Sequence, residues 1–414
     1  MIVYIVVVLV MGISYYSLLS KYTELWSSMI PLTIDDSFVT SVTIVVPFRN
    51  EAQNLGALIK SLNDLELGHH QVEVLFINDH STDNSVNVIA ENAISLKYNV
   101  LNNPLTGKKE ALKLAWQHAS GDIVLQTDAD CVLPSTWLVS MLHPFANEKV
   151  QLVSGPVDFY ATTNFWSKMV RLDFNALIAI GTAHITWKKP MLCNGANLAY
   201  RKTVLESFKY KENKASGDDI YLLQHVHLSA PEGICFNQTQ DAIVMTSGPQ
   251  HFREFWNQRI RWASKNGDYD LKQNTVILAF VWFYNVVIVL SFLSFNSVGY
   301  TVAAFLVVLK ILAENKFYRS FSSFFSLSGW FKSKNNDWDN PNDHPIPPNT
   351  IPLIQTATDI LGLDYNEINH GISIEIGDNP LDKPFVVFAP QATAGCKEWV
   401  YDNWVKLSKL IKDK

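Results

Sequence analysis

The sequence predicts an α/β domain with a largely parallel sheet, accompanied by hydrophobic segments long enough to cross a membrane. Three observations predict it. Short β-branched runs alternate with helix-like segments between residues 40 and 130, as in parallel sheets. One of these runs, residues 124–127, ends in two aspartates, Asp128 and Asp130. Two long stretches of the 414-residue chain carry no charge.

Composition and charge exclude several classes of protein. With 48% hydrophobic residues the chain can bury a large core, and its length predicts two or three structural units. A net charge of -6 argues against general nucleic-acid binding. The four cysteines form no Cys-x-x-Cys pair, so a reduced, cytosolic setting fits them better than a disulfide framework.

The first uncharged stretch, residues 2–20, is long enough to cross a bilayer. A cleaved signal peptide is the alternative, but no basic region precedes the run and no small-residue cleavage site ends it. We expect a retained anchor over residues 1–21. The second stretch is broken near residues 294–297 and predicts a helical hairpin over residues 274–313, with a buried helix pair as the alternative. Basic residues flank all three spans and predict cytoplasmic flanks, with residues 21–273 inside.

The middle of the chain alternates predicted strands and helices. Strands are expected at residues 42–47, 72–77, 97–101 and 123–126, and helices at residues 52–62 and 108–118. No Gly-x-Gly-x-x-Gly or P-loop pattern occurs, which argues against dinucleotide and P-loop sites. Strand alternation places Asp128 and Asp130 on one side at the carboxyl end of their strand, where open α/β sheets bind ligands. A divalent cation bridging to phosphate would relieve their repulsion, whereas a solvated acidic turn is the alternative.

Four motifs in this order resemble the donor-site motifs of family 2 glycosyltransferases, which are inverting enzymes with the GT-A fold. They are residues 45–51, residues 76–83, residues 107–111 and the Asp128-Ala129-Asp130 motif. The resemblance covers residues 40–273 and implies that the chain binds a nucleotide-sugar. It also implies Mg²⁺ or Mn²⁺ at Asp128 and Asp130, and a place near the donor phosphates for Lys108. The residues that would hold the nucleoside are Pro47, Arg49, Asn50, Glu51 and Asp79.

Two further motifs are assigned through the same resemblance. Asp218 and Asp219 stand where the family has its general base, with Asp219 as the stronger candidate. Their alternative role is to cap the helix that follows. Residues 193–197 resemble the loop near the donor sugar, and Asn197 is expected to contribute to acceptor binding. A plain turn is the alternative for this loop.

Gln258, Arg261 and Trp262 match the Gln-x-x-Arg-Trp motif of processive synthases and of some non-processive lipid glycosyltransferases. On a helix these three side chains share one face and would form an acceptor platform. Tryptophan can stack on a sugar ring, and arginine can bind diphosphate oxygens. The alternative is a basic amphipathic helix at a membrane surface, whose aromatic side chains enter the membrane. Those aromatic residues are Phe252, Phe255 and Trp256.

The tail has a different composition. Residues 314–350 include a polar, proline-rich stretch and are expected to form a linker. Residues 351–414 predict a short α/β segment, and residues 388–399 resemble part of a GT-B heptosyltransferase. The segment has too few strands for a complete GT-B half, so no second active site is inferred.

These features lead to one hypothesis and two alternatives. The hypothesis is an inverting, metal-dependent glycosyltransferase of the cell (inner) membrane, with its catalytic domain in the cytoplasm. It would move a sugar from a nucleotide-sugar to a lipid-linked or saccharide acceptor in cell-envelope glycan synthesis. A processive polysaccharide synthase is the first alternative, although two spans after the catalytic domain are few for a polymer channel. The second alternative is a catalytically inactive membrane scaffold.

Overall fold

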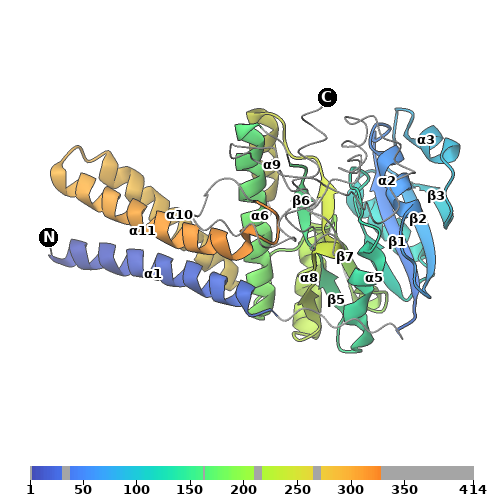
Figure 1. Ribbon diagram of the computed structural model, residues 1–414, viewed down its shortest axis with the longest axis horizontal. Helices are drawn as coiled ribbons and strands as arrows, with labels where there is room; N and C mark the ends of the chain where they lie inside the picture. Colours follow the sequence, from blue (N-terminus) through green and yellow to red (C-terminus); the bar gives the residue numbers. More distant parts are fainter. Residues whose placement is uncertain (1, 30–37, 162–163, 209–216, 264–271, 328–414) are drawn as a thin grey trace, which may run out of the picture. The chain divides into compact units, whose positions relative to one another are not determined.

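The computed structural model describes residues 2–29, 38–161, 164–208, 217–263 and 272–327 (Figure 1). The α/β segment expected at residues 351–414 and most of the expected linker lie outside these described residues.

A seven-stranded sheet forms the centre of the described chain, in the order β3-β2-β1-β4-β7-β5-β8. Strand β7 runs antiparallel to both of its neighbours, and all other pairs in this sheet are parallel. The α/β class with a largely parallel sheet is therefore confirmed. The strands are β1 (Ser41–Phe48), β2 (Gln71–Asn78), β3 (Lys97–Asn102), β4 (Ile123–Gln126), β5 (Leu152–Ser154), β7 (Leu198–Arg201) and β8 (Ile234–Phe236). A separate parallel pair is formed by β6 (Val157–Phe159) and β9 (Val244–Thr246).

Helices cover both faces of the central sheet because the strands are apolar on both sides, as parallel strands usually are. On one face, side chains of α2 (Leu55–Asn63), α3 (Ser85–Glu91) and α5 (Trp137–Leu142) join the main hydrophobic core. On the other face, α4 (Lys108–His118) and α8 (Asp218–Ser229) form a second core. Short helical segments complete this unit: η1 (His143–Ala146), α7 (Val204–Ser207) and η2 (Gln240–Ala242).

Three helices are long and apolar enough to cross a membrane: α1 (Ile2–Ser27), α10 (Lys272–Phe292) and α11 (Ser297–Ser322). The turn between α10 and α11 falls where the sequence predicts it, and the Asn296 side chain caps α11 by accepting a hydrogen bond from the Gly299 amide at 2.9 Å. Helix α11 continues past the expected boundary at residue 313. It does so because Phe317 and Phe321 on its last turns are buried in a cluster with α1.

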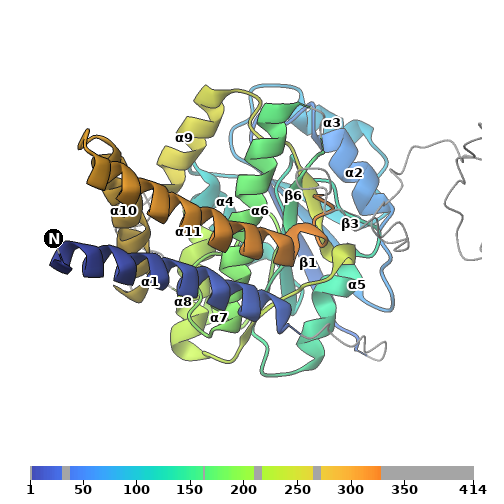
Figure 2. The same ribbon diagram turned by 60° about the vertical axis from the view of Figure 1, so that its left-hand side comes forward.

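Two further helices connect the sheet with the apolar helices. Helices α6 (Phe165–Thr186) and α9 (Phe252–Ala263) lie side by side and run across the direction of α1 and α11 (Figures 1 and 2). Helix α6 buries Ala179 and Ala183 in the same cluster as the side chains of α1 and α11. His184 of α6 is fully buried and its Nε2 lies 2.9 Å from the hydroxyl of Tyr22 on α1. The helices of membrane-spanning length therefore pack directly onto the α/β unit.

Candidate active site

An open cleft of about 640 Å³ lies where β1, β2 and β4 end. This volume is within the range of small-molecule sites. The parallel strands deliver their following loops to one edge of the sheet, so motifs far apart in the sequence meet there. The predicted site residues that line the cleft are Pro47, Arg49, Glu51, Asp79, Lys108, Asp128, Asp130, Asp218, Asp219, Gln258, Arg261 and Trp262. Asn50 and Asn197 are the two predicted site residues that do not line it.

Asp79 is a fixed, nearly buried carboxylate on the β2 side of the cleft. Its Oδ1 accepts hydrogen bonds from the Asn103 side chain at 2.9 Å and from the Gly107 amide at 2.8 Å. Gly107 has a φ of 110°, which glycine adopts without strain, and it directly precedes α4. The Arg49 guanidinium lies 3.9 Å from the other Asp79 oxygen. Asp79 therefore fixes the loop from which Lys108 enters the cleft.

Acidic side chains concentrate around the end of β4. Burial and the charge of Asp128 raise the pKa of the Asp130 carboxyl group. Asp130 also accepts a hydrogen bond from the Thr246 hydroxyl at 3.1 Å. Burial raises the pKa of Glu51 as well, with smaller contributions from Asp130 and Asp128. The cleft therefore disfavours an uncompensated set of negative charges and favours a bound cation.

Lys108 is the cation that these carboxylates meet in the structure. Its ammonium group forms an ion pair with Asp128. Desolvation disfavours the charged form of this lysine. The negative charge of Asp128, followed by those of Asp219 and Asp218, outweighs the desolvation and raises the Lys108 pKa. The same ammonium group therefore responds to the carboxylates after β4 and to those that begin α8. Both acidic pairs face one shared volume.

Asp128 and Asp130 fit a metal that is shared with a phosphate ligand. Among the described residues, no group of three or more His, Cys, Asp or Glu side chains is arranged to hold an ion. Mg²⁺ is often bound by one or two carboxylates together with substrate phosphates, and these carboxylates match that donor set. The raised pKa of Asp130 is also the direction expected for a carboxylate that lacks a positive partner.

The second acidic pair lies at the start of α8. Gly217, with a φ of 105°, precedes Asp218 and Asp219. The Oδ2 atom of Asp219 accepts a weak hydrogen bond from the Gly195 amide at 3.3 Å. A β-carbon at Gly195 would lie 3.0 Å from Nε2 of Gln126, which is tighter than ordinary packing allows. The loop at Gly195 therefore lies against the end of β4 and beside Asp219.

Gln258, Arg261 and Trp262 line the cleft from α9. Trp262 also packs against the main core and lies near Phe174 of α6, with ring centroids 6.2 Å apart. The Arg259 guanidinium lies 4.5 Å from the centre of the Trp262 ring and forms an ion pair with Asp173 of α6. Arg259 was not predicted as a site residue. Because Arg259 contacts both the Trp262 ring and Asp173 of α6, it holds the Trp262 side chain of α9 next to α6.

The two predicted residues outside the cleft lining have structural contacts. Asn50 has a φ of 57°, and its side-chain oxygen accepts a hydrogen bond from the Thr82 amide at 2.8 Å. Asn197 is fully buried, and its Nδ2 donates to the carbonyl groups of Pro156 and Ala242 at 2.7 and 2.8 Å. Its side-chain oxygen accepts from the indole of Trp137. Asn197 therefore joins three segments below the cleft, and we leave it out of the acceptor site.

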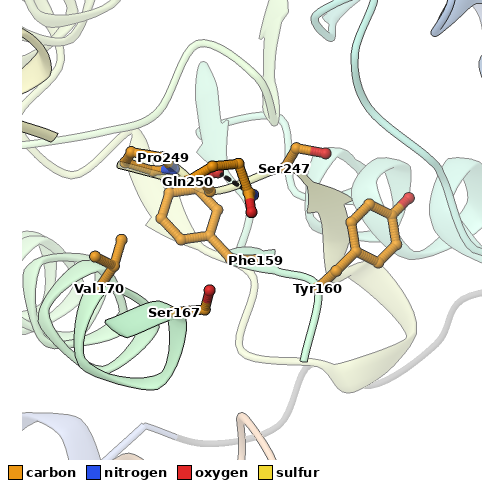
Figure 3. Close-up of a pocket in the computed structure, with 8 residues that line it drawn as sticks. Phe159, Tyr160, Ser167, Val170, Ser247, Pro249 and Gln250 are labelled. Atoms are coloured by element: carbon orange, nitrogen blue, oxygen red, sulfur yellow. Dashed lines mark hydrogen bonds between the residues drawn. The ribbon is translucent and has the colours of Figure 1, made fainter. Parts of the chain in front are cut away.

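A small cavity of about 50 Å³ adjoins the cleft and shares Phe159 and Ser247 with it. Figure 3 shows the Phe159 ring below Pro249 and Gln250, with the Tyr160 side chain on the other side of the cavity. This volume holds a few water molecules and is too small for a sugar ring. The larger cleft is therefore the candidate substrate site.

Several lining residues were missed by the sequence analysis. Thr246, which holds Asp130, lies 116 residues after it in the chain and belongs to no motif. Gln126 donates to the Gly195 carbonyl at 3.0 Å and connects β4 to the loop beside Asp219. A polar residue at the end of an otherwise apolar strand was the available signal for Gln126. No comparable signal marks Thr246, because its role depends on the pairing of β6 with β9.

Comparison with known proteins shows which family the chain resembles. Residues 43–208 match the family model described as Glycosyl transferase family 2. The chain is 24% identical over 237 residues to a probable glycosyltransferase, YdaM, of Bacillus subtilis, covering 54% of this chain and 55% of the relative. It is 28% identical over 229 residues to a beta-monoglucosyldiacylglycerol synthase of Nostoc, covering 54% and 48%. The chain thus spans about half the length of these curated relatives.

A longer match and a solved structure extend the comparison. A poly-beta-1,6-N-acetyl-D-glucosamine synthase of Staphylococcus epidermidis is 24% identical over 284 residues, covering 64% of this chain and 68% of the relative. The mannosyltransferase PcManGT from Pyrobaculum calidifontis, solved with GDP-Man and Mn²⁺, superposes with a TM-score of 0.54 at 19% identity. That alignment covers 79% of this chain and 94% of the other and supports the GT-A fold. Residues 43–208 therefore match the glycosyltransferase family 2 model, and the solved structure supports a GT-A fold for the chain.

Proposed function

We propose that the protein is a membrane-bound, inverting glycosyltransferase that moves a sugar from a nucleotide-sugar to a lipid-linked or saccharide acceptor. One observation carries the proposal. The acidic residues after β4, the acidic pair of α8 and the Gln-x-x-Arg-Trp residues of α9 line a single cleft. Three helices of membrane-spanning length and apolarity support the membrane-bound part.

The donor would lie along the carboxyl ends of β1, β2 and β4. Pro47, Arg49 and Glu51 would contact the nucleoside together with Asp79, which is already held in place by the Gly107 amide. Lys108 would exchange its contact with Asp128 for the donor phosphates, since the ammonium group can reorient on its flexible stem. A Mg²⁺ or Mn²⁺ ion at Asp128 and Asp130 would neutralise charge on the leaving diphosphate.

Asp219 would act as the general base. Its carboxylate would take the proton of the acceptor hydroxyl as that oxygen forms a bond to the anomeric carbon. The bond from this carbon to the diphosphate oxygen breaks in the same step, and its electron pair leaves with the diphosphate. A single displacement of this kind inverts the anomeric configuration. Asp218 lies beside Asp219 at the start of α8 and is the second candidate for the base.

Trp262, Arg261 and Gln258 would hold the acceptor. The Trp262 ring is fixed between the core and Arg259, so it offers a rigid surface for a sugar or lipid headgroup. The curated relatives include a glycolipid synthase and a polymer synthase, so both a single addition and a processive reaction fit the family. We favour a single addition because the described residues contain only three helices of membrane-spanning length.

The purified full chain should be tested with a panel of nucleotide-sugars in detergent, with Mn²⁺, Mg²⁺ or excess chelator. Metal-dependent release of the nucleoside diphosphate from one donor is expected, together with a glycosylated lipid or saccharide product. Absence of donor turnover with every nucleotide-sugar, in protein that still binds nucleotide, would favour the inactive scaffold. Products with many sugars per acceptor would favour the processive synthase.

A further inference from the structure

Gln126 is a polar side chain in a strand that is otherwise apolar. It ends β4, whose four residues are all buried, and only 3% of Gln126 is exposed. A buried amide costs free energy unless its donor and acceptor groups find partners. Strand alternation puts Gln126 on the same face as Val124, which packs in the second core with side chains of α4 and α8. Gln126 nevertheless also lines the cleft, so it connects the core with the candidate active site.

A chain of hydrogen bonds fixes the orientation of the Gln126 amide. The indole of Trp116, on α4, donates to the hydroxyl oxygen of Tyr200, on β7, at 2.8 Å. The Tyr200 hydroxyl in turn donates to Oε1 of Gln126, at 3.5 Å. With Oε1 turned to Tyr200, the Nε2 group of Gln126 is free to donate to the Gly195 carbonyl, at 3.0 Å. The donors therefore follow one direction, from α4 to the loop in the cleft lining.

Gly195 connects Gln126 with Asp219. Its carbonyl accepts from Gln126, and its amide donates to Oδ2 of Asp219 at 3.3 Å. A β-carbon at Gly195 would lie 3.0 Å from Nε2 of Gln126 and 3.6 Å from Oδ2 of Asp219, so both groups lie against the glycine. Because glycine has wide backbone freedom, the direction of its amide depends on contacts such as the one with Gln126. The other Asp219 oxygen accepts from the Ile220 amide at 2.9 Å.

From these contacts we infer that Gln126 is a positioning residue for the base, acting on Asp219 through Gly195. By holding the Gly195 carbonyl, Gln126 keeps the Gly195 amide directed at the Asp219 carboxylate and fixes its orientation. Each carboxylate oxygen keeps a further lone pair with which to accept the proton of the acceptor hydroxyl. A displacement of about 1 Å can cost about 10²-fold in rate, so this restraint affects the chemical step. The inference rests on the proposed function, in which Asp219 is the base.

Thr43 provides a matched control. It is also a fully buried polar side chain on a strand, β1, and its hydroxyl oxygen accepts a hydrogen bond from the Gly121 amide at 2.9 Å. Thr43 lies near the start of β1, whereas the cleft lies at the end of that strand, and Thr43 does not line the cleft. Thr43→Val should therefore lower stability by removing a buried contact with a glycine, as Gln126→Met does, and leave kcat unchanged.

The test uses the purified full chain in detergent, with Gln126→Met, Thr43→Val, Asp219→Asn and the combination of Gln126→Met with Asp219→Asn. Values of kcat and KM are measured with the nucleotide-sugar that the unsubstituted chain turns over. Binding is measured with the nucleoside diphosphate of that donor in the presence of Mn²⁺. Amide hydrogen exchange of residues 193–197, followed by mass spectrometry, reports the loop without requiring activity. Gln126→Leu replaces Gln126→Met if the latter shows no cooperative thermal transition.

Gln126→Met should lower kcat by about 10–100-fold and leave nucleoside diphosphate binding unchanged, because the base is displaced while the donor site is intact. Exchange in residues 193–197 should become faster than in the unsubstituted chain, whereas Thr43→Val should leave it unchanged. In the Asp219→Asn background, adding Gln126→Met should lower kcat little further, because a residue that acts through Asp219 then has no base to position.

Three results would each overturn the inference alone. They are a kcat in Gln126→Met equal to that in Thr43→Val, unchanged exchange in residues 193–197, and full multiplication of the two losses in the double variant. Weaker nucleoside diphosphate binding in Gln126→Met would assign this residue to the donor site and would overturn the inference as well. Absence of turnover by the unsubstituted chain, or full turnover by Asp219→Asn, would instead overturn the proposed function, and the inference with it.

Discussion

The buried ion pair between Arg171 of α6 and Asp158 of β6 should be the most sensitive contact between the sheet and the apolar helices. The Arg171 Nε atom lies 2.9 Å from Asp158, and the guanidinium also donates to the Phe325 carbonyl, just after α11, at 2.7 Å. The two side chains are 14% and 3% exposed. Replacing Arg171 with methionine keeps much of the apolar volume and leaves the Asp158 carboxylate buried without its cation.

The magnitude follows from that burial. Removing one partner of a buried pair typically costs about 3–5 kcal/mol. We therefore expect the thermal midpoint of the purified chain in detergent to fall by about 10 °C at pH 7.

Two companion variants make the reasoning refutable. Arg171→Met combined with Asp158→Asn removes the unpaired charge and should restore most of the lost stability. Lys188→Met is the matched control, because Lys188 pairs with Glu232 at 2.9 Å on an exposed surface. That change should cost less than about 1 kcal/mol. An Arg171→Met midpoint within about 2 °C of the control, or a double variant no more stable than the single one, would refute the assigned role.

The remaining predictions concern chemistry and topology. Asp130→Asn should abolish turnover and metal-dependent donor binding without lowering the thermal midpoint, so full activity in excess chelator would contradict the metal assignment. Asp219→Asn should slow the chemical step by roughly 10²–10⁴-fold while donor binding, measured by nucleotide titration, stays nearly unchanged. Trp262→Ala should mainly harm acceptor use and raise the ratio of donor hydrolysis to transfer, and equal loss of nucleotide binding in both variants would point to structural roles. A cysteine at exposed Glu148 should escape labelling from outside intact cells, and its labelling there would contradict a cytoplasmic catalytic domain.

The side of the cleft that we propose for the donor could be predicted because its residues follow strands directly. Asp79 comes after β2, and Asp128 and Asp130 come after β4. Because β2 and β4 both pair in parallel with β1, these residues meet at one edge of the sheet, independently of the structure of the rest of the chain. Short apolar runs also give the strand positions, because a strand buried on both faces has few polar residues. Both inferences use only local sequence and the topology of parallel sheets.

Asn197 shows where local sequence is insufficient. Its loop matches a family pattern, yet the side chain turns inward because Gly155 leaves space for it. A β-carbon at Gly155 would lie 2.3 Å from the Asn197 amide nitrogen. The direction of this side chain therefore depends on a residue 42 positions earlier in the chain, across the pairing of β5 with β7. No property of the loop itself distinguishes the buried orientation from an exposed one.

Helix α6 was not predicted, and its absence from the prediction has a physical cause. Its charged residues fall among apolar ones, and only the structure shows that Arg171 faces Asp158 while Asp173 faces Arg259 of α9. Its opposite side packs on α1 through Ala183 and places His184 against Tyr22. The sheet, the Trp262 ring and the apolar helices all meet this single helix. A change that tilts α6 would therefore move the proposed acceptor side of the cleft, at Trp262, while leaving the proposed donor side, which depends on β1, β2 and β4, in place.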